Sequence, residues 1–591
     1  MIFSKTHFIF LLVVLFTFSS ESRSQTNIKW HLLLHQPGKE PYIVGNFIDK
    51  FERPVRLYKK SNGINVTATF EKVNDQIQFT AIASSSQKDS CYISLQATYI
   101  EGETYTYLGE QKEDEIYRQS PHNPEDGSFA ELMRQDVPMF AIKDSTGFTV
   151  AINNSPVFYD NYTVQHIKPS IKQVTISSGD DGKGINPLPK HLNIKPYHHL
   201  VEKGKPHTFS GIIFKSKANN INDLRKDVML GVAKRWSGIE DRLGATSWAS
   251  NYMLLRKNET KYSDVWVVAG NIYAHKQFTR DGFWQSFVLP AEFAAECYRH
   301  EAVSQAQGAE RPLFTLIWAY RTKLNGGEVN MAAARRSLKY IDDHIKDNKF
   351  YSNNNPVKKD FQYWLDVVAF DIDDVITANQ GLAAVALLSA EKLGLKPKSS
   401  ADLVIKQYQN MFNKEKGYFP ISEKKDLLSV DVLMGDLLAQ VLFDRPLLSS
   451  DMVNSTFQSI TRRSKTPYGY KIVSMPNGDY ALPELYNATD FKVDPGLGKG
   501  VGSYQAGGSW YLYDMLFLLD CYLHKVPGAK EELLWRGALD FKLGGTFFEH
   551  TNTVTGIPDK PNQGWNAAVY SIWKILMDKG LADQSLLDAI K

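Results

Sequence analysis

Cysteine is scarce in this 591-residue sequence, which has only Cys91, Cys297 and Cys521. An odd number of widely separated cysteines excludes a disulfide framework as the main support of the fold. It also leaves no cysteine pattern typical of a zinc site. We expect no metal ion and no other cofactor.

Charge of one sign is lacking too, because 68 Lys and Arg residues are balanced by 65 Asp and Glu residues, for a net charge of +3. Such a balance gives no reason to expect a nucleic-acid or acidic-membrane partner. Aromatic residues, by contrast, make up 12% of the chain. Their flat apolar faces and polar edges suit a core or a sugar, and together with balanced charge they favour an oligosaccharide or polysaccharide substrate.

Apolar runs long enough to span a bilayer are absent. The start, MIFSKTHFIFLLVVLFTFSSESRSQ, has Lys5 before a short apolar run from Phe8 to Phe18, then Ser22 and Ser24. This arrangement is typical of a cleavable signal peptide over residues 1–24. We expect a periplasmic or secreted protein without membrane insertion, whose oligomeric state the sequence leaves open.

Residues 25–217 show the alternation of antiparallel strands. QIQFTAIA, CYISLQATYI, FTVAINN, KQVTISS and HTFSGIIF alternate apolar and polar residues and are separated by turn residues. Alternation of period two with turns between the runs predicts an N-terminal antiparallel β-sandwich.

Residues 218–591 change to the period of amphipathic helices. In the first helix, Leu224, Val228 and Val232 share one face, and Asn222 or Asp223 is expected to cap it. Further helices are expected over 245–256, 282–305, 309–325, 329–348, 374–394, 398–414, 425–443, 449–464, 503–525, 528–542 and 563–579. About twelve helices with alternating short and long links predict an α+β multidomain protein whose second domain is an (α/α)6 toroid of six hairpins.

Four long connections are expected to carry the site, over 257–281, 349–373, 465–502 and 543–562, because loops on a rigid scaffold commonly hold functional residues. In the first, Arg280 and Asp281 precede Trp284. They form either a surface ion pair of little energetic weight or a sugar clamp on which the Trp ring stacks.

The second connection holds Asp366 in the apolar stretch YWLDVV, next to Trp364. An apolar setting raises the pKa of a carboxyl group and suits it to act as a general acid. The alternative is a structural Asp satisfied by backbone donors. Asp373 or Asp374 has a simpler explanation, as the cap of the following helix.

The last two connections add further polar and aromatic residues. SYQAGGSW places Tyr504, Gln505 and Trp510 where a helix begins. GGTFFEHTNTVTG delivers Glu549 to a turn at the end of an apolar run, where an unpaired carboxylate would be unfavourable. Paired carboxylates are the usual groups of glycoside hydrolysis, and Glu549 with Asp366 would supply them.

Three stretches resemble, in the same order, motifs of the six-hairpin glycosidases. AGNIYAHKQFTRDGFWQSFVLP is similar to a run of the amylo-α-1,6-glucosidase and glucoamylase-like group and its processing α-glucosidase relatives, with Thr279 where Gly is usual. YWLDVVAFDIDDVITANQGL is similar to their Thr-Trp-Met-Asp segment, and FFEHTNTVTG with GWNAAVY to their Glu-Asn-Tyr-Asn-Pro-x-Thr-Gly turn and following helix. The resemblance spans about 221–580, and a sandwich before the toroid is also the family's order.

The resemblance implies an inverting hydrolase of α-linked glycosides. Asp366 takes the position of the general acid and Glu549 that of the base. His550 and Thr551 replace the usual Asn and aromatic residue, which is where the substrate would differ. The expected sugar-binding residues are Arg280, Asp281, Trp284, Trp364, Tyr504, Gln505, Trp510, His550 and Trp565.

The two carboxyl groups of an inverting pair lie roughly 6.5 to 9.5 Å apart, and Asp281 is the first replacement for Asp366 if they do not. Three alternatives stay open. A polysaccharide lyase would use Tyr and His bases, a phosphorylase would need only one catalytic carboxylate, and a glycan-binding protein would bind sugar without releasing any.

Overall fold

The computed structural model describes residues 28–48, 53–100, 102–105, 129–135, 139–153, 161–167, 172–178, 198–236, 242–252, 254–257, 265–270, 277–303, 310–352, 363–365, 368–371, 373–481, 485, 500–542, 547–560 and 563–582. The chain divides into two compact units. Unit 1 comprises residues 1–108, 112–155 and 159–231, and unit 2 comprises 109–111, 156–158 and 232–591. The expected signal peptide and Asp366 lie outside the described residues.

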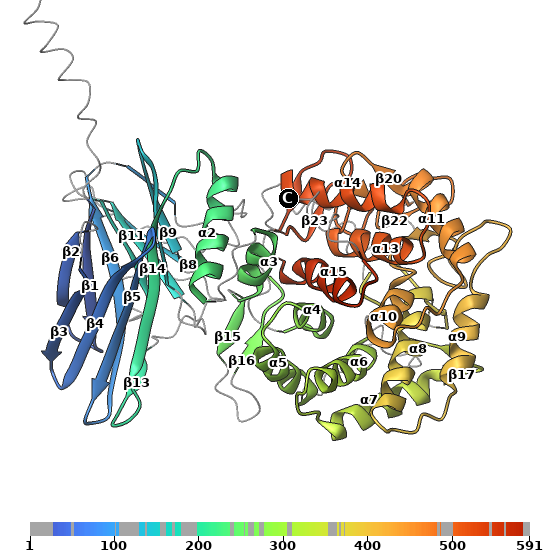
Figure 1. The fold of residues 1–591 in the computed structure, drawn as a ribbon, viewed down its shortest axis with the longest axis horizontal. Coiled ribbons are helices and arrows are strands. Elements are labelled where there is room, and N and C mark those ends of the chain that lie inside the picture. Colours follow the sequence, from blue (N-terminus) through green and yellow to red (C-terminus); the bar gives the residue numbers. More distant parts are fainter. Residues whose placement is uncertain are drawn as a thin grey trace, which may run out of the picture. The chain divides into compact units, whose positions relative to one another are not determined.

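Unit 1 contains two antiparallel seven-stranded sheets (Figure 1). One sheet has the order β2-β1-β6-β12-β11-β8, with β13 paired to β6, and the other has the order β3-β4-β5-β14-β10-β9-β7. The strands are β1 (Lys29–His35), β2 (Tyr42–Ile48), β3 (Val55–Ser61), β4 (Ile64–Val73), β5 (Gln76–Ser85), β6 (Asp89–Tyr99), β7 (Glu103–Tyr105), β8 (Phe129–Gln135), β9 (Met139–Asp144), β10 (Gly147–Asn153), β11 (Asn161–Ile167), β12 (Lys172–Ser177), β13 (His199–Val201) and β14 (His207–Ser216).

Alternation along the strands builds the core of unit 1. On β4 the buried residues Ile64, Val66, Ala68 and Phe70 alternate with more exposed neighbours, so one face of the strand points inward. Aromatic rings then join the two sheets, as Trp30 of β1 stacks on Phe140 of β9 at 5.9 Å. All five runs that predicted strands form strands, which confirms the antiparallel sheets.

Helix α2 (Ile221–Trp236) begins earlier than expected. The Asn220 side chain accepts a hydrogen bond from the backbone N–H of Asp223 at 2.9 Å, so Asn220 caps the helix and the predicted caps Asn222 and Asp223 are wrong. The predicted apolar face is confirmed, since Leu224, Val228 and Val232 are fully buried.

Unit 2 is mainly helical. Its helices are α3 (Arg242–Tyr252), α4 (Thr279–Gln285), α5 (Ala291–Val303), α6 (Arg311–Leu324), α7 (Met331–His344), α8 (Thr377–Lys392), α9 (Ala401–Asn410), α10 (Met434–Phe443), α11 (Ser450–Ser464), α13 (Tyr511–Leu523), α14 (Ala529–Lys542), the 3-10 helix η4 (Gly564–Ala567) and α15 (Ala568–Asp578). Its short strands are β15 (Leu255–Lys257), β16 (Val265–Val267), β17 (Ile345–Lys346), β18 (Lys349–Phe350), β19 (Leu428–Ser429), β20 (Lys465–Thr466), β21 (Gly469–Tyr470), β22 (Val473–Ser474), β23 (His550–Thr551) and β24 (Pro558–Asp559).

Several expectations about helix boundaries are wrong. The helices expected from 425 and from 503 begin at Met434 and Tyr511. The single helix expected over 282–305 is two helices, α4 and α5, separated by a turn that ends at Pro290, which cannot donate a backbone hydrogen bond within a continuous helix. Helix α8 begins at Thr377, so neither Asp373 nor Asp374 caps it. Asp374 instead accepts hydrogen bonds from the Ser422 hydroxyl and the Lys424 N–H.

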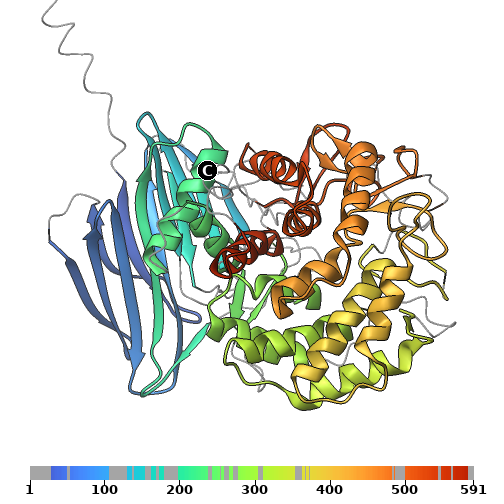
Figure 2. The same cartoon turned by 45° about the vertical axis from the view of Figure 1, so that its right-hand side comes forward.

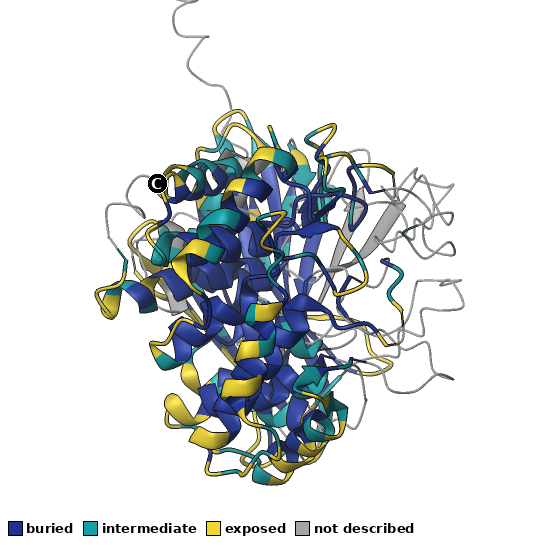
Figure 3. Ribbon diagram, turned by 90° about the vertical axis from the view of Figure 1, so that its right-hand side faces the viewer, coloured by how far each residue is buried: buried dark blue, intermediate teal, exposed yellow. Residues whose placement is uncertain are grey.

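Contacts link the helices of unit 2 in a continuous series. Helix α4 contacts α6, α6 contacts α8, α8 contacts α10, α10 contacts α13, α13 contacts α15, and η4 contacts both α13 and α4. Figures 1 and 2 show these helices around a common centre, with α5, α7, α9, α11 and α14 outside them. Buried residues accordingly lie toward the centre of the helical array, and exposed residues lie at its periphery (Figure 3). The finer expectation of six hairpins closed into a toroid stays a prediction.

No helix among the described residues has the length and apolar character that a membrane span requires. The three cysteines are free and buried.

Two glycines allow helices α8 and α10 to approach backbone to backbone. A Cβ atom added at Gly435 of α10 would lie 2.5 Å from the carbonyl carbon of Gly381 of α8. Backbone atoms cannot move aside as the end of a flexible side chain can, so glycine is required at this crossing.

We therefore predict that Gly435→Ala lowers the free energy of unfolding by about 2 kcal/mol, despite the better helix propensity of Ala, because the clash forces the two helices apart. Denaturant unfolding measures the loss. Gly500→Ala is the matched control, since no described atom lies within 4 Å of its added Cβ. Equal stability of the two variants would contradict the tight crossing.

Candidate active site

The start of α4 places Arg280 in a charged and aromatic setting. Its Nη1 donates to Glu310 Oε2 at 2.8 Å, and its guanidinium lies over the rings of Trp364 and Trp565, 5.3 and 5.4 Å from their centroids. The preceding residue, Thr279, donates to Glu301 Oε1 at 2.6 Å and anchors the start of the helix. Burial alone would lower the pKa of Arg280, but Tyr513, Glu310 and Asp281 raise it instead, so the cation is permanent.

Trp364 is held through both its backbone and its side chain. Its backbone N–H donates to Glu310 Oε1 at 2.6 Å, and its indole N–H donates to Asp431 Oδ2 at 2.7 Å. Its carbonyl oxygen accepts from the Gln505 side-chain amide at 2.9 Å. The ring itself stacks on Tyr513 with 4.0 Å between centroids. Trp364 thus joins segments that are far apart in the sequence.

Glu549 stands immediately before strand β23 and is 3% exposed. Its backbone N–H donates to the carbonyl oxygen of Lys560, at the far end of the β23–β24 hairpin. Its Oε1 accepts from Gln563 Nε2 at 3.0 Å, and its Oε2 lies 3.0 Å from Lys560 Nζ and 3.5 Å from His550 Nδ1. The hairpin and η4 therefore hold the carboxylate from both sides.

Asp281 and Glu549 are both buried, yet their surroundings shift their pKa values in opposite directions. Burial raises the pKa of Asp281 to about 7, with Glu549 and Glu310 adding to the rise and Arg280 opposing it. Burial would also raise the pKa of Glu549, but Lys560 and His550 outweigh it and lower that pKa to about 2. At pH 6, Glu549 is ionised and Asp281 is mainly protonated.

Aromatic rings surround these groups. Trp510 donates its indole N–H to the carbonyl oxygen of Tyr504 at 3.1 Å, and Tyr504 has a left-handed φ of 42°. The His550 ring stacks on Trp510 at 5.6 Å and meets Tyr504 edge-on at 5.5 Å. Trp565 meets Trp510 edge-on at 5.9 Å. We call the whole group the carboxylate–aromatic cluster, which comprises Arg280, Asp281, Glu310, Trp364, Asp431, Tyr504, Gln505, Trp510, Tyr513, Glu549, His550, Lys560, Gln563 and Trp565.

The cluster brings together nine of the eleven residues singled out from the sequence. Asp366 lies outside the described residues, two positions beyond Trp364. Trp284 lies elsewhere, fully buried among Phe283, Phe287 and Phe314, and no face of its ring is open for the expected stacking on a sugar. The roles of all eleven residues stay predictions.

Five members of the cluster were not singled out from the sequence: Glu310, Asp431, Tyr513, Lys560 and Gln563. Asp431 interrupts the apolar run LLSVDVLM, the same signal that singled out Asp366. It is fully enclosed, and burial together with Glu310 raises its pKa far above the ordinary value. Glu310, Lys560 and Gln563 stand in polar stretches with no such signal, and Tyr513 stands in an apolar helix where an aromatic residue is ordinary.

Among the residues that the structure describes, one group of side chains has the composition of a metal site. Ligand atoms of Asp436, Asp520 and His524 lie within 4.8 Å of one another. Asp436 already accepts from His524 Nε2 at 2.6 Å and from the backbone N–H of Leu448 at 2.8 Å, while Asp520 accepts from Gln440 at 2.8 Å. Hydrogen bonds therefore account for this arrangement.

The carboxylate–aromatic cluster can perform acid–base chemistry on a neutral polar molecule. It offers one ionised carboxylate, one carboxyl group that is protonated below pH 7, and a fixed cation among aromatic rings. Separating the pKa values of two carboxyl groups is how one site supplies both a base and a proton donor at the same pH.

The sequence matches no family model and no curated protein. Among solved structures it is similar to the GH63 mannosylglycerate hydrolase of Thermus thermophilus, with 10% identity over 56% of this chain and 100% of the other and a TM-score of 0.34. A candidate kojibiose phosphorylase from the human microbiome shows 8% identity over 92% of this chain and 78% of the phosphorylase, with a TM-score of 0.30. A polysaccharide lyase shows 8% identity over 94% of this chain and 92% of the lyase, with a TM-score of 0.23. These neighbours are carbohydrate-active enzymes, and at such TM-scores they decide neither reaction nor substrate.

The ion pair with Lys560 makes a prediction about stability. The folded-state pKa of Glu549, about 2, lies below the ordinary 4.5, so the ionised group stabilises the fold above pH 4.5, and this contribution is lost as the pH falls toward 2. Lys560→Met raises that pKa and should lower the free energy of unfolding at pH 7 by about 2 kcal/mol.

Denaturant unfolding at pH 7 and pH 3 tests this, with a smaller difference between variant and wild type expected at pH 3. Lys416→Met is the matched control, because its ion pair with Asp426 is exposed. A loss for Lys560→Met that is the same at both pH values would show that the ion pair does not hold Glu549 ionised.

Proposed function

We propose that this protein is an exported glycoside hydrolase that cleaves an α-linked glycoside with inversion at the anomeric carbon. The observation that carries the proposal is the pair of buried carboxyl groups with opposite pKa shifts, Asp281 and Glu549, beside a fixed cation and several aromatic rings. Glycoside hydrolysis requires one carboxyl group that donates a proton and one that is ionised, and sugars are bound by aromatic faces and fixed polar groups.

In this proposal Glu549 is the general base. Its low pKa keeps it ionised throughout the physiological range. The Gln563 amide holds one carboxylate oxygen at 3.0 Å and Lys560 holds the other, so the group has a defined orientation. A base that takes a proton from water for attack on the sugar is the inverting arrangement.

Asp366 is the proposed general acid, by its resemblance to the family motif. Trp364, two residues earlier in the sequence, is itself fixed by hydrogen bonds to both of its backbone polar groups. Asp281 is proposed to hold the sugar together with Arg280. Because it is protonated below pH 7, it can donate a hydrogen bond to a sugar oxygen and would take over proton donation if Asp366 does not supply it.

The proposed scaffold is an (α/α)6 toroid. Helices α4, α6, α8, α10, α13 and α15 would form its inner ring, and the series of contacts that returns through η4 to α4 supports this. Arg280 and Glu310 then mark one mouth of the ring, since both stand at helix starts. The β-sandwich domain before it is assigned no separate activity.

The proposal predicts that Glu549→Gln lowers kcat by roughly 10³-fold, because an amide cannot accept the proton of the attacking water. Asp366→Asn should cause a loss of similar size. A panel of α-linked oligosaccharides assayed for released sugar measures both, and proton NMR of the first product gives its anomeric configuration. Asp402→Asn is the control, because this exposed carboxylate pairs only with Arg445 among the described residues.

Each outcome discriminates between functions. Release that requires inorganic phosphate and survives Glu549→Gln would replace hydrolysis by phosphorolysis. An unsaturated product would replace it by a lyase reaction. Binding without release by the wild type would identify a glycan-binding protein, and full activity of both carboxyl variants would overturn the site.

A second prediction concerns pH. Because the pKa of Asp281 is about 7 and its protonated form is the hydrogen-bond donor, kcat/KM of the wild type should fall above pH 7. Asp281→Asn keeps a hydrogen-bond donor that cannot ionise. The kcat/KM of this variant should therefore be lower overall and should no longer fall above pH 7. An unchanged alkaline limb in the variant would assign it to another group.

A further inference from the structure

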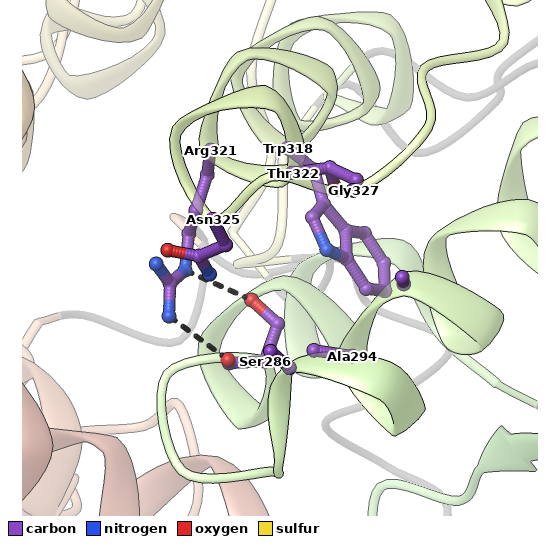
Figure 4. Close-up of a pocket in the computed structure, with 9 residues that line it drawn as sticks. Ser286, Ala294, Trp318, Arg321, Thr322, Asn325 and Gly327 are labelled. Carbon is purple, nitrogen blue, oxygen red and sulfur yellow. Dashed lines mark hydrogen bonds between the residues drawn. The ribbon is translucent and has the colours of Figure 1, made fainter.

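A small cavity lies in unit 2 at the opposite end of α4 from Arg280 and Asp281. It is lined by the C-terminal residues of α4 and α6 and by the start of α5 (Figure 4): Ser286, Ala291, Ala294, Ala295, Trp318, Arg321, Thr322, Asn325 and Gly327. Its volume is about 10 Å³. That space fits one water molecule or one ion of similar size.

The cavity wall carries a buried cation. Arg321 is 7% exposed, and its guanidinium lies 3.7 Å from the centroid of the Phe287 ring. Two of its five N–H groups are used on Ser286, with Nε donating to the hydroxyl oxygen at 3.2 Å and Nη2 to the carbonyl oxygen at 2.9 Å. Among the residues that the structure describes, no carboxylate forms an ion pair with it.

A buried positive charge without a counter-charge is unfavourable, because burial removes its hydration. Burial accordingly lowers the pKa of Arg321, to about 10, so the group still carries its full charge at pH 7. The cation therefore persists under all ordinary conditions, and a negative charge in the cavity would relieve its desolvation.

The other walls also suit an anion. Ala291, the first residue of α5, lines the cavity, so the cavity lies at the positive end of this helix's dipole. The Asn325 amide adds a possible donor beside the guanidinium (Figure 4). Ala291, Ala294 and Gly327 leave the space open by their small size.

We propose that this cavity, the Arg321 cavity, binds a small monovalent anion such as chloride. The anion accepts hydrogen bonds from the guanidinium N–H groups that Ser286 does not use. Since Ser286 is the C-terminal cap of α4, the anion fixes the helix whose first turn carries Arg280 and Asp281. The inference is independent of the proposed function, because binding is measured without a substrate.

Bromide provides the direct test, as an anomalous scatterer that replaces chloride. Crystals of the full chain soaked in sodium bromide should give an anomalous peak within hydrogen-bonding distance of the Arg321 guanidinium. A cavity that holds only water, without anomalous signal, would overturn the proposal.

A solution experiment tests the same point. The Tm of the wild type should rise by about 2 °C from gluconate to chloride buffer at equal ionic strength. Arg321→Gln should lose this rise, and Arg321→Lys, which keeps the charge but not the planar donor fork, should keep only part of it. Arg445→Gln, at an exposed ion pair, is the control and should keep it fully. An equal rise in wild type and Arg321→Gln would assign the effect to another site.

Discussion

The candidate site depends on the hydrogen bonds and the ring contact that hold Trp364 in place. Glu310 and Asp431 each bind it with a carboxylate oxygen, Gln505 binds its carbonyl oxygen, and Tyr513 supports its ring. The second oxygen of Glu310 binds Arg280, so one carboxylate fixes both the cation and the indole. Buried hydrogen bonds to carboxyl oxygens are directional, and such polar groups would be costly to leave unpaired. Segments more than 100 residues apart are thereby held in one geometry.

Much of the fold could be predicted from the sequence, because the local period of apolar residues indicates which face of a helix or strand is buried. The strands of unit 1 and the apolar face of α2 followed from such patterns. The boundaries of helices, by contrast, depend on single hydrogen bonds, such as the one that Asn220 accepts, or on a single residue, such as Pro290. The period of apolar residues contains no information about these. The break between α4 and α5 therefore divides what the periodicity predicted as one helix.

The members of the candidate site that the sequence singled out stand in an apolar run or in a motif, as Glu549 and Trp364 do. The supporting residues of the site were not singled out, because their importance arises only in three dimensions. Lys560 is an ordinary surface-like lysine in the sequence, yet the β23–β24 hairpin brings it against Glu549. Trp284 differs from them: its position next to Arg280 and Asp281 in the sequence suggested a sugar contact, and the structure places its ring in the core.

The 3.0 Å contact between Lys560 and Glu549 has a consequence for the proposed role of Glu549 as a base. A carboxylate with a pKa of about 2 is a weak base, and proton abstraction is most efficient when the pKa of the base lies near the working pH. Any ligand that draws the ammonium group of Lys560 toward its own oxygens makes Glu549 more basic at that moment. The reactivity of Glu549 would then be set by occupancy, low in the empty protein and higher in the complex.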